Sequence, residues 1–139
     1  MSIGLNVISM TRPRKPTDAE LAILRVLWTR GPSTVREVHD SLASGRTVGY
    51  TTTLKTLQVM QEKGLTLRED HRGLHLHSAR FPEQDTLRHL VLDLVDRAFG
   101  GSTSRLVIQA LSSRRASPEE LQEIRQLLDG KDGKDGHDE

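Results

Sequence analysis

Residues 50–64 carry the side chains best suited to chemistry with a partner molecule, and they read Tyr-Thr-Thr-Thr-Leu-Lys-Thr-Leu-Gln-Val-Met-Gln-Glu-Lys-Gly. At about 100° per residue, a helix here gathers its apolar residues on one side: Leu54, Leu57 and Met60. The opposite side carries Thr51, Thr52 and Lys55, with Thr56 at the margin. Threonine and lysine side chains contact base edges in the major groove of DNA. The segment therefore predicts a recognition helix, with an ordinary solvated helix face as the alternative.

Polar and basic residues elsewhere in the first 80 residues are candidates for contact with DNA phosphates. They are Thr34, Arg36, Arg46, Arg68 and Arg72. Residues 1–80 hold 12 Lys and Arg against 7 Asp and Glu, whereas residues 81–139 hold 8 against 12. A polyanion would therefore bind the first part of the chain. The alternatives are that Thr34 only caps a helix and that Arg72 only belongs to a solvent-exposed turn.

Two further helices are expected ahead of the recognition helix. Each opens with a capping box, Thr17-x-x-Glu20 in the first and Thr34-x-x-Glu37 in the second. In such a box each side chain accepts a hydrogen bond from the backbone of the other. Gly31-Pro32 ends the first helix and Ser44-Gly45 the second, so that Arg46 lies in the turn before the recognition helix.

After Gly64 the apolar period changes to two. Leu65 and Leu67 alternate with polar residues, as do Leu74 and Leu76, and the segment 69–73 between them is a turn signal. This pattern predicts a β-hairpin with His75 and His77 facing solvent. Three helices followed by a hairpin make a winged helix-turn-helix, so the expected fold is mostly α with one small hairpin over residues 17–80.

Residues 81–130 are expected to form a helical dimerisation domain, because their apolar residues hold spacings of three and four. The residues expected at the interface are Leu87, Leu90, Val91, Leu94, Val95, Leu106, Leu111, Leu121, Ile124 and Leu128. The alternative is that these helices fold back on the winged domain as ordinary core. Gly130 is expected to end the last helix. Residues 131–139 then form a disordered tail and residues 1–16 a flexible basic arm, with Met1 or Met10 as the true start.

Composition excludes several classes of function. The chain has no cysteine, which excludes disulfides and thiolate metal sites. It shows no phosphate-binding glycine loop, nucleophile elbow or metal-binding helix motif, so we expect no enzyme, no cofactor and no metal. No apolar run reaches the roughly 18 residues of a membrane span, and a cytoplasmic location is expected. Two alternatives to DNA binding stay open: a protein-interaction module, and a metal-responsive regulator using His71, His75 and His77.

The chain resembles the BlaI/MecI/CopY penicillinase-repressor family from about Pro16 to Leu128. The resemblance is carried by Thr17-Asp18-Ala19-Glu20-Leu21, Leu27-Trp28, Thr34-Val35, Glu37-Val38, Tyr50-Thr51-Thr52-Thr53-Leu54 and Lys63-Gly64-Leu65. It implies a winged-helix homodimer, paired through its C-terminal helices, that binds a palindromic operator and represses transcription. Several members are inactivated when a membrane sensor protease, responding to a cell-wall antibiotic, triggers cleavage in the dimerisation region.

The chain departs from that family pattern in two places. The segment Leu106–Leu111, which corresponds to the cleavage region, lacks the Asn-Phe pair of the penicillinase repressors. The hairpin has Arg72-Gly73-Leu74-His75-Leu76-His77 in place of the usual Gly-Arg-x-x-x-Tyr order. The absence of cysteine also excludes the thiolate copper sensing of the related copper-responsive branch.

Overall fold

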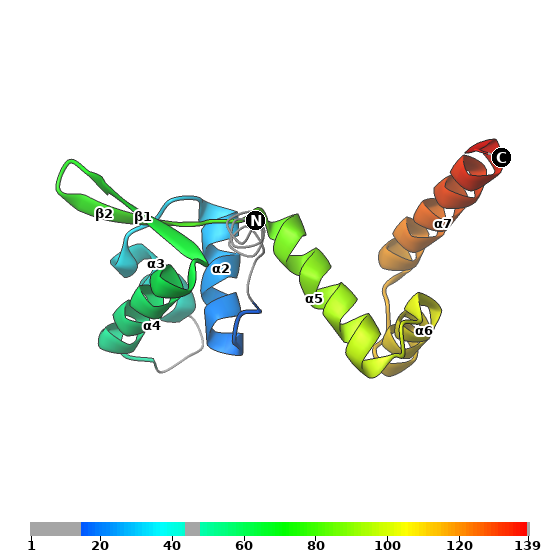
Figure 1. The fold of residues 1–139 in the computed structure, drawn as a ribbon, viewed down its shortest axis with the longest axis horizontal. Helices are drawn as coiled ribbons and strands as arrows, with labels where there is room; N and C mark the ends of the chain where they lie inside the picture. The colour runs from blue at the N-terminus through cyan, green and yellow to red at the C-terminus, as the bar shows by residue number, and fades with distance from the viewer. Residues whose placement is uncertain (1–14, 44–47, 139) are drawn as a thin grey trace, which may run out of the picture. The chain divides into compact units, whose positions relative to one another are not determined.

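The computed structural model describes residues 15–43 and 48–138. The chain divides into two compact units, one ending at Asp93 and the other beginning at Leu94. The elements follow in the order α2 (Asp18–Arg30), α3 (Val35–Ala43), α4 (Tyr50–Lys63), β1 (Thr66–His71), β2 (Leu74–Ala79), α5 (Glu83–Ala98), α6 (Thr103–Ser113) and α7 (Pro118–Asp138) (Figure 1). The predicted order of helices and hairpin is confirmed.

Helix α2 begins at the predicted capping box. The Thr17 hydroxyl accepts a hydrogen bond from the Glu20 amide at 3.2 Å, and a Glu20 carboxylate oxygen accepts one from the Thr17 amide at 2.9 Å. The helix ends at Gly31, whose φ of 87° suits a residue without a Cβ. Both boundaries therefore follow from local sequence signals.

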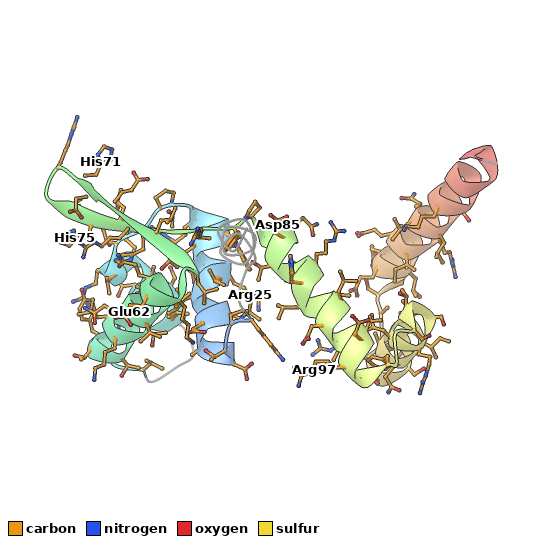
Figure 2. The ribbon with its side chains drawn as sticks, in the orientation of Figure 1. Arg25, Glu62, His71, His75, Asp85 and Arg97 are labelled. Atoms are coloured by element: carbon orange, nitrogen blue, oxygen red, sulfur yellow. The ribbon has the colours of Figure 1, made fainter. Side chains whose placement is uncertain are left out.

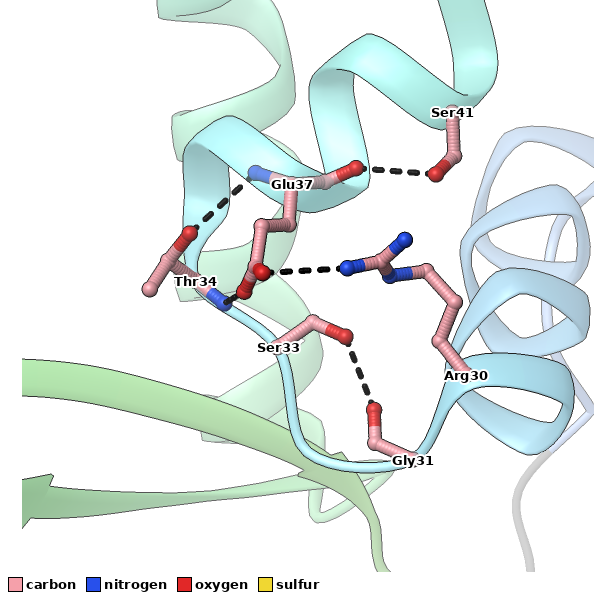
Figure 3. Close-up of polar contacts among 6 residues, drawn as sticks. All are labelled: Arg30, Gly31, Ser33, Thr34, Glu37 and Ser41. Atoms are coloured by element: carbon pink, nitrogen blue, oxygen red, sulfur yellow. Dashed lines mark hydrogen bonds and ion pairs between the residues drawn. The ribbon is translucent and has the colours of Figure 1, made fainter.

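Helix α3 begins in the same way after a short connection (Figure 3). The Thr34 hydroxyl accepts from the Glu37 amide at 3.2 Å, and Glu37 accepts from the Thr34 amide at 2.9 Å. In the connection, the buried Ser33 donates its hydroxyl hydrogen to the Gly31 carbonyl at 2.8 Å. The turn that follows α3, with Arg46, lies outside the described residues.

The core of the first unit lies among α2, α3, α4 and the base of the hairpin. Its buried apolar residues are Ile23, Leu24, Leu27, Val35, Val38, Leu57, Met60 and Leu65. Leucine, isoleucine and valine dominate it, as expected for a chain with 3% aromatic residues. Trp28 packs against this cluster, and its indole Nε1 donates to the Phe81 carbonyl at 3.1 Å, which holds the end of the hairpin against α2.

The hairpin is antiparallel and projects away from α2, α3 and α4 (Figure 1). The prediction of solvent-facing histidines is confirmed for His75, which is exposed, and is wrong for His77, which is buried at 4% exposure. Leu67 and Leu74 are 47% and 58% exposed. His77 is buried because Ser33 and His77 exchange two backbone hydrogen bonds, of 2.9 Å and 2.7 Å, which hold the base of β2 against the connection between α2 and α3.

The turn of the hairpin is also shorter than predicted. Both strands continue to His71 and Leu74, which leaves only Arg72 and Gly73 between them. Arg72 has φ 51° and Gly73 has φ 81°, so both lie in the left-handed region. Positive φ at both central residues is the requirement of the type I′ turn, whose twist matches that of the flanking strands.

The second unit consists of the end of α5 with α6 and α7. Gly130 does not end α7: the helix continues to Asp138 and includes residues 131–138, for which a disordered tail was predicted. A glycine inside a helix costs about 1 kcal/mol relative to alanine and does not by itself break it. Among the described residues, no helix combines the length and the apolar character that crossing a membrane requires.

Candidate DNA-binding surface

Helix α4 presents the polar face that the sequence predicts. Thr51, Thr52 and Lys55 are exposed, while Leu57 and Met60 on the opposite side are completely buried. Gly49 at the N-cap provides no side-chain hydrogen bond to the first amides of the helix. The positive end of the helix dipole is therefore not satisfied by a cap side chain and favours an anion such as phosphate.

Thr56 differs from the other predicted contact residues of α4. It is only partly exposed, and its hydroxyl donates to the Thr52 carbonyl at 2.8 Å. The hydroxyl hydrogen is thus already engaged within the helix. Of the four contact residues predicted on α4, Thr51, Thr52 and Lys55 are therefore the exposed ones.

A cluster of four side chains joins α3 to the start of α4, and sequence reasoning did not find it. The Arg36 guanidinium lies 4.4 Å from the centre of the Tyr50 ring, and His39 packs its edge on the same ring at 5.7 Å. His39 Nδ1 is 3.0 Å from the hydroxyl of the buried Thr53. The matching i, i+3 spacings of Arg36–His39 and Tyr50–Thr53 are the signal that could have revealed the cluster. Arg36 adds a cation beside the first turn of α4.

Thr34 serves as a helix cap, because its hydroxyl and its amide are both bonded to Glu37. The pKa of Glu37 lies below its ordinary value because of the Thr34 amide first, and then the Thr34 hydroxyl and the Arg30 charge at 3.0 Å. Ser41 donates to the Glu37 carbonyl (Figure 3). The hydrogen bonds of Thr34 in the structure are therefore those of a helix cap.

A partly buried ion pair joins the end of α4 to the start of α2. Lys63 Nζ lies 2.8 Å from Glu20 Oε2, and Glu20 is 3% exposed. Burial alone raises the pKa of Glu20, but the hydrogen bonds from Lys63 and Thr17 outweigh it and lower that pKa below its ordinary value. The pair and the capping box share the Glu20 carboxylate, which therefore joins the end of α4 to the start of α2 in addition to the apolar core between the two helices.

The hairpin carries a different arrangement of charges on its far part. Asp70 accepts a hydrogen bond from His75 and lies 3.7 Å from Arg68. The pKa of Asp70 is lowered by the His75 hydrogen bond first and by the charges of His75 and Arg68. Arg68 is thus engaged with an acid, whereas Arg72 stands at the tip. Figure 2 shows His71 and His75 near this far end.

His77 lies at the base of the hairpin, and its Nδ1 atom has no hydrogen-bond partner among the described residues. The pKa of His77 is lowered, first by burial and then by the charges of Arg68 and His75. No group of three or more His, Cys, Asp or Glu within residues 15–43 and 48–138 is arranged to hold a metal ion. The predicted metal alternative therefore gains no support from the hairpin histidines.

The residues predicted at a dimer interface fall into three classes. Leu87, Val91, Leu94, Leu111 and Leu128 are exposed, Leu90, Leu106, Leu121 and Ile124 are half-buried, and Val95 is buried. Four further apolar residues of these helices are exposed: Leu92, Val107, Ile108 and Leu127. Val95 thus packs within its own chain, and each of α5, α6 and α7 carries exposed apolar side chains.

A family model described as penicillinase repressor matches residues 16–130. The chain belongs to this family. The match covers both the winged unit and the C-terminal helices, which agrees with the extent of the resemblance carried by the sequence motifs. Because the family consists of repressors, membership agrees with the expectation that the chain is not an enzyme.

Two named proteins are similar to this chain in sequence. The transcriptional regulator BlaI of Mycobacterium tuberculosis is 32% identical over 82 residues, which are 58% of this chain and 59% of that protein. The chain thus spans less than two thirds of the length of that relative. The penicillinase repressor of Bacillus licheniformis is 23% identical over 113 residues, covering 81% of this chain and 88% of the relative.

Two solved structures are also similar. One is the solution structure of the monomeric form of Bacillus licheniformis BlaI in complex with the blaP half-operator, with a TM-score of 0.46 and 23% identity over 52% of this chain and 92% of that one. The other is Bordetella bronchiseptica BpsR, with a TM-score of 0.43 and 20% identity over 92% of this chain and 84% of that one.

Proposed function

We propose that the chain is a transcriptional repressor that binds a palindromic operator as a homodimer. The observation that carries the proposal is the division of α4 into a buried apolar side and an exposed side with Thr51, Thr52 and Lys55 in its first turns. In helix-turn-helix proteins, residues near the start of the recognition helix meet the base edges. Membership of the penicillinase repressor family supports the same function.

The charges on and around α4 are ordered along the helix, apart from Lys63, which is paired with Glu20. Arg36 and Lys55 lie near its N-terminal half, and Glu62 lies toward its C-terminal end (Figure 2). The positive half coincides with the positive end of the helix dipole. This order suits a helix that enters the major groove by its N-terminal end, with Glu62 kept away from the phosphates.

Exposed apolar side chains on α5, α6 and α7 support the homodimer part of the proposal. Such residues in contiguous groups mark association surfaces on soluble domains. A two-fold pair would place two α4 helices on half-sites one helical turn apart, about 34–36 Å. Binding of the second half-site then becomes intramolecular, which raises the overall affinity without new contacts.

Fluorescence anisotropy of the purified protein with random-pool duplexes, followed by selection and sequencing, tests DNA binding directly. Lys55→Ala should lower affinity for the selected duplex more than for random duplex, because it removes a base contact. Arg72→Ala should weaken both alike and reduce the salt slope by about one. Arg25→Ala is the matched control. It removes an exposed arginine of α2 that lines a groove together with Ser41 of α3.

The outcomes separate the proposal from its alternative. Equal losses on both duplexes for Lys55→Ala would refute the base contact. Failure of the unmodified protein to bind any duplex would refute the function and favour a protein-interaction module, with the exposed face of α4 as its docking surface. That alternative also predicts that binding to its partner changes little with salt.

Sedimentation equilibrium tests the homodimer. Leu111→Glu on α6 should lower the association constant, because it places a charge in an apolar interface. Leu67→Glu on the hairpin is the control and should leave association unchanged. An unmodified chain that stays monomeric at every concentration would overturn the two-fold model.

Relief of repression by cleavage, which the family resemblance implies, has a structural requirement in this chain. The corresponding segment Leu106–Leu111 lies inside α6. Proteolysis favours exposed, loosely held backbone rather than helix interiors. Cleavage here would therefore follow local unwinding of α6, and hydrogen exchange of its amides measures how often that occurs.

A further inference from the structure

Among the described residues, Arg36 is an exposed cation that forms no ion pair. It lies in the first turn of α3, where the positive end of the helix dipole disfavours a cation. The neighbouring acid, Glu37, is paired with Arg30 at 3.0 Å. Asp40 lies one turn further along α3, but within residues 15–43 and 48–138 no ion pair joins it to Arg36. The charge of Arg36 is therefore available to an anion outside the chain.

The ring of Tyr50, and not a carboxylate, is the partner of Arg36. The guanidinium carbon lies 4.4 Å from the centre of this ring. A cation–π contact at an exposed site is stronger than an exposed i, i+4 ion pair, and a cation that precedes its acid is the weaker order for such a pair. The ring therefore competes well with Asp40. Packing of the guanidinium on a ring also leaves its N–H groups, which spread in one plane, free to donate hydrogen bonds.

The Tyr50 ring is itself supported by α3 and α4. His39, one turn after Arg36 on α3, packs against it nearly perpendicularly, with the ring planes at 79°. A hydrogen bond of 3.0 Å between His39 Nδ1 and the Thr53 hydroxyl fixes the imidazole. Thr53 lies one turn after Tyr50 on α4 and is 1% exposed. The contacts thus alternate between the two helices, begin at a buried residue and end at the guanidinium of Arg36.

We propose that Tyr50 is a positioning residue, whose ring holds the Arg36 guanidinium toward one phosphate of the duplex that α4 contacts. This inference rests on the proposed DNA-binding function. The planar N–H groups of arginine match the oxygens of a phosphate, and a guanidinium already held in one orientation loses less freedom on binding. Phosphate contacts fix the register of a protein on its duplex. Because Tyr50 is also the first residue of α4, this contact and the entry of α4 into the groove are linked.

The first experiment is a double-mutant cycle on DNA affinity. A duplex selected from a random pool by the unmodified protein is titrated with Tyr50→Leu, Arg36→Ala and the double variant in fluorescence anisotropy. Tyr50→Leu keeps the cation and removes the ring, so it should weaken binding about two- to fivefold. The same change should have no effect when residue 36 is already alanine, because no guanidinium is left to hold. Equal losses in the two backgrounds would overturn the proposal.

Matched variants separate positioning from a merely structural role. Tyr50→Phe keeps the face of the ring and removes only the hydroxyl, so it should bind DNA like the unmodified protein. A loss as large as that of Tyr50→Leu would assign the contact to the hydroxyl and refute the inference. Arg36→Ala should reduce the salt slope by about one, as expected for one lost phosphate contact. Both side chains are exposed, and urea titration with Trp28 emission verifies that each variant is folded.

The second experiment locates the phosphate. Each phosphate of the selected duplex is replaced in turn by an uncharged methylphosphonate. One replacement should weaken binding of the unmodified protein and leave that of Arg36→Ala unchanged, because the variant has no partner for this phosphate. Its effect on Tyr50→Leu should be smaller than on the unmodified protein. An equally large effect on Tyr50→Leu would show that Arg36 needs no ring, and the absence of any such position would refute the contact itself.

Failure of the inference is distinguishable from failure of the proposed function. If the unmodified protein selects no duplex, the DNA-binding function itself fails. If it selects one and Arg36→Ala binds it with unchanged affinity and salt slope, the function stands and the phosphate contact is wrong. If Arg36→Ala loses affinity and Tyr50→Leu does not, Arg36 binds DNA without the help of the ring, and the positioning role is wrong.

Discussion

Replacing Glu20 by glutamine tests how far one buried carboxylate organises the winged unit. Glutamine keeps the capping box, because it also accepts a bond from the N-cap amide. It removes the negative charge facing Lys63 at 2.8 Å. A hydrogen bond to a charged group contributes about 1.5–3 kcal/mol and a neutral one about 0.5–1.5. The expected loss in the free energy of unfolding is therefore about 1–2 kcal/mol.

The exposure of Lys63 sets the upper limit of this loss. Breaking a fully buried pair costs about 3–5 kcal/mol, but the Lys63 side chain is 33% exposed and can turn toward water. Glu37→Gln is the matched control, because Glu37 has the same capping role and an arginine partner at 3.0 Å in an exposed pair. It should destabilise the protein less than Glu20→Gln does.

Urea titration followed by tryptophan fluorescence measures the free energy of unfolding of the winged unit. Trp28 is the only tryptophan and lies in α2, so its emission reports on the winged unit. Because the folded-state pKa of Glu20 is lowered, its contribution is complete above the ordinary value of 4.5 and is lost as the pH falls through the folded-state pKa. The difference between the unmodified protein and Glu20→Gln should therefore shrink in acid. Equal losses for the two variants, or a difference that persists in acid, would refute the reasoning.

Three further predictions concern the hairpin and its junction with α4. Because the pKa of His77 is lowered in the folded state, its effect should leave the hairpin fully stable above about pH 6.5 and less stable below it. Hydrogen exchange of the strand amides on either side of that pH measures the change. Arg72→Asn should stabilise the hairpin by about 1 kcal/mol, because asparagine tolerates left-handed backbone, and should weaken DNA binding in anisotropy. Gly64→Ala should destabilise the unit by about 1–2 kcal/mol in the urea assay, because Gly64 has φ 81° and a Cβ there would lie 2.9 Å from an Arg80 nitrogen. A neutral effect of Gly64→Ala would show that the junction can shift.

The helices could be predicted from the sequence because their signals are local. Both capping boxes, Thr17–Glu20 and Thr34–Glu37, bind as the spacing indicates. The two sides of α4 follow from its period in the same way. These features depend on residues within one or two turns, so distant parts of the chain do not change them.

The hairpin faces could not be predicted, because they depend on a distant contact. The alternation of leucines fits either face of the strands, and a one-residue shift exchanges them. The bridge between Ser33 and His77, 44 positions apart, buries the base of β2 and leaves the rest of that strand outside the core. The stacking of Arg36 on Tyr50 depends likewise on the packing of α3 against α4. The part of the candidate site that lies on α4 was therefore predictable, and the part on the hairpin was not.

The Ser33–His77 bridge also has a consequence for engineering. Its two hydrogen bonds join main-chain atoms only, so they do not depend on the side chains of the outer hairpin. At the base, the buried side chains Thr66 and His77 limit which residues fit. A hairpin from another protein, grafted between Thr66 and His77 with the same register, should therefore pack on the helices in the same way. The outer part of the hairpin can therefore be replaced while α4 and the base of the hairpin are kept.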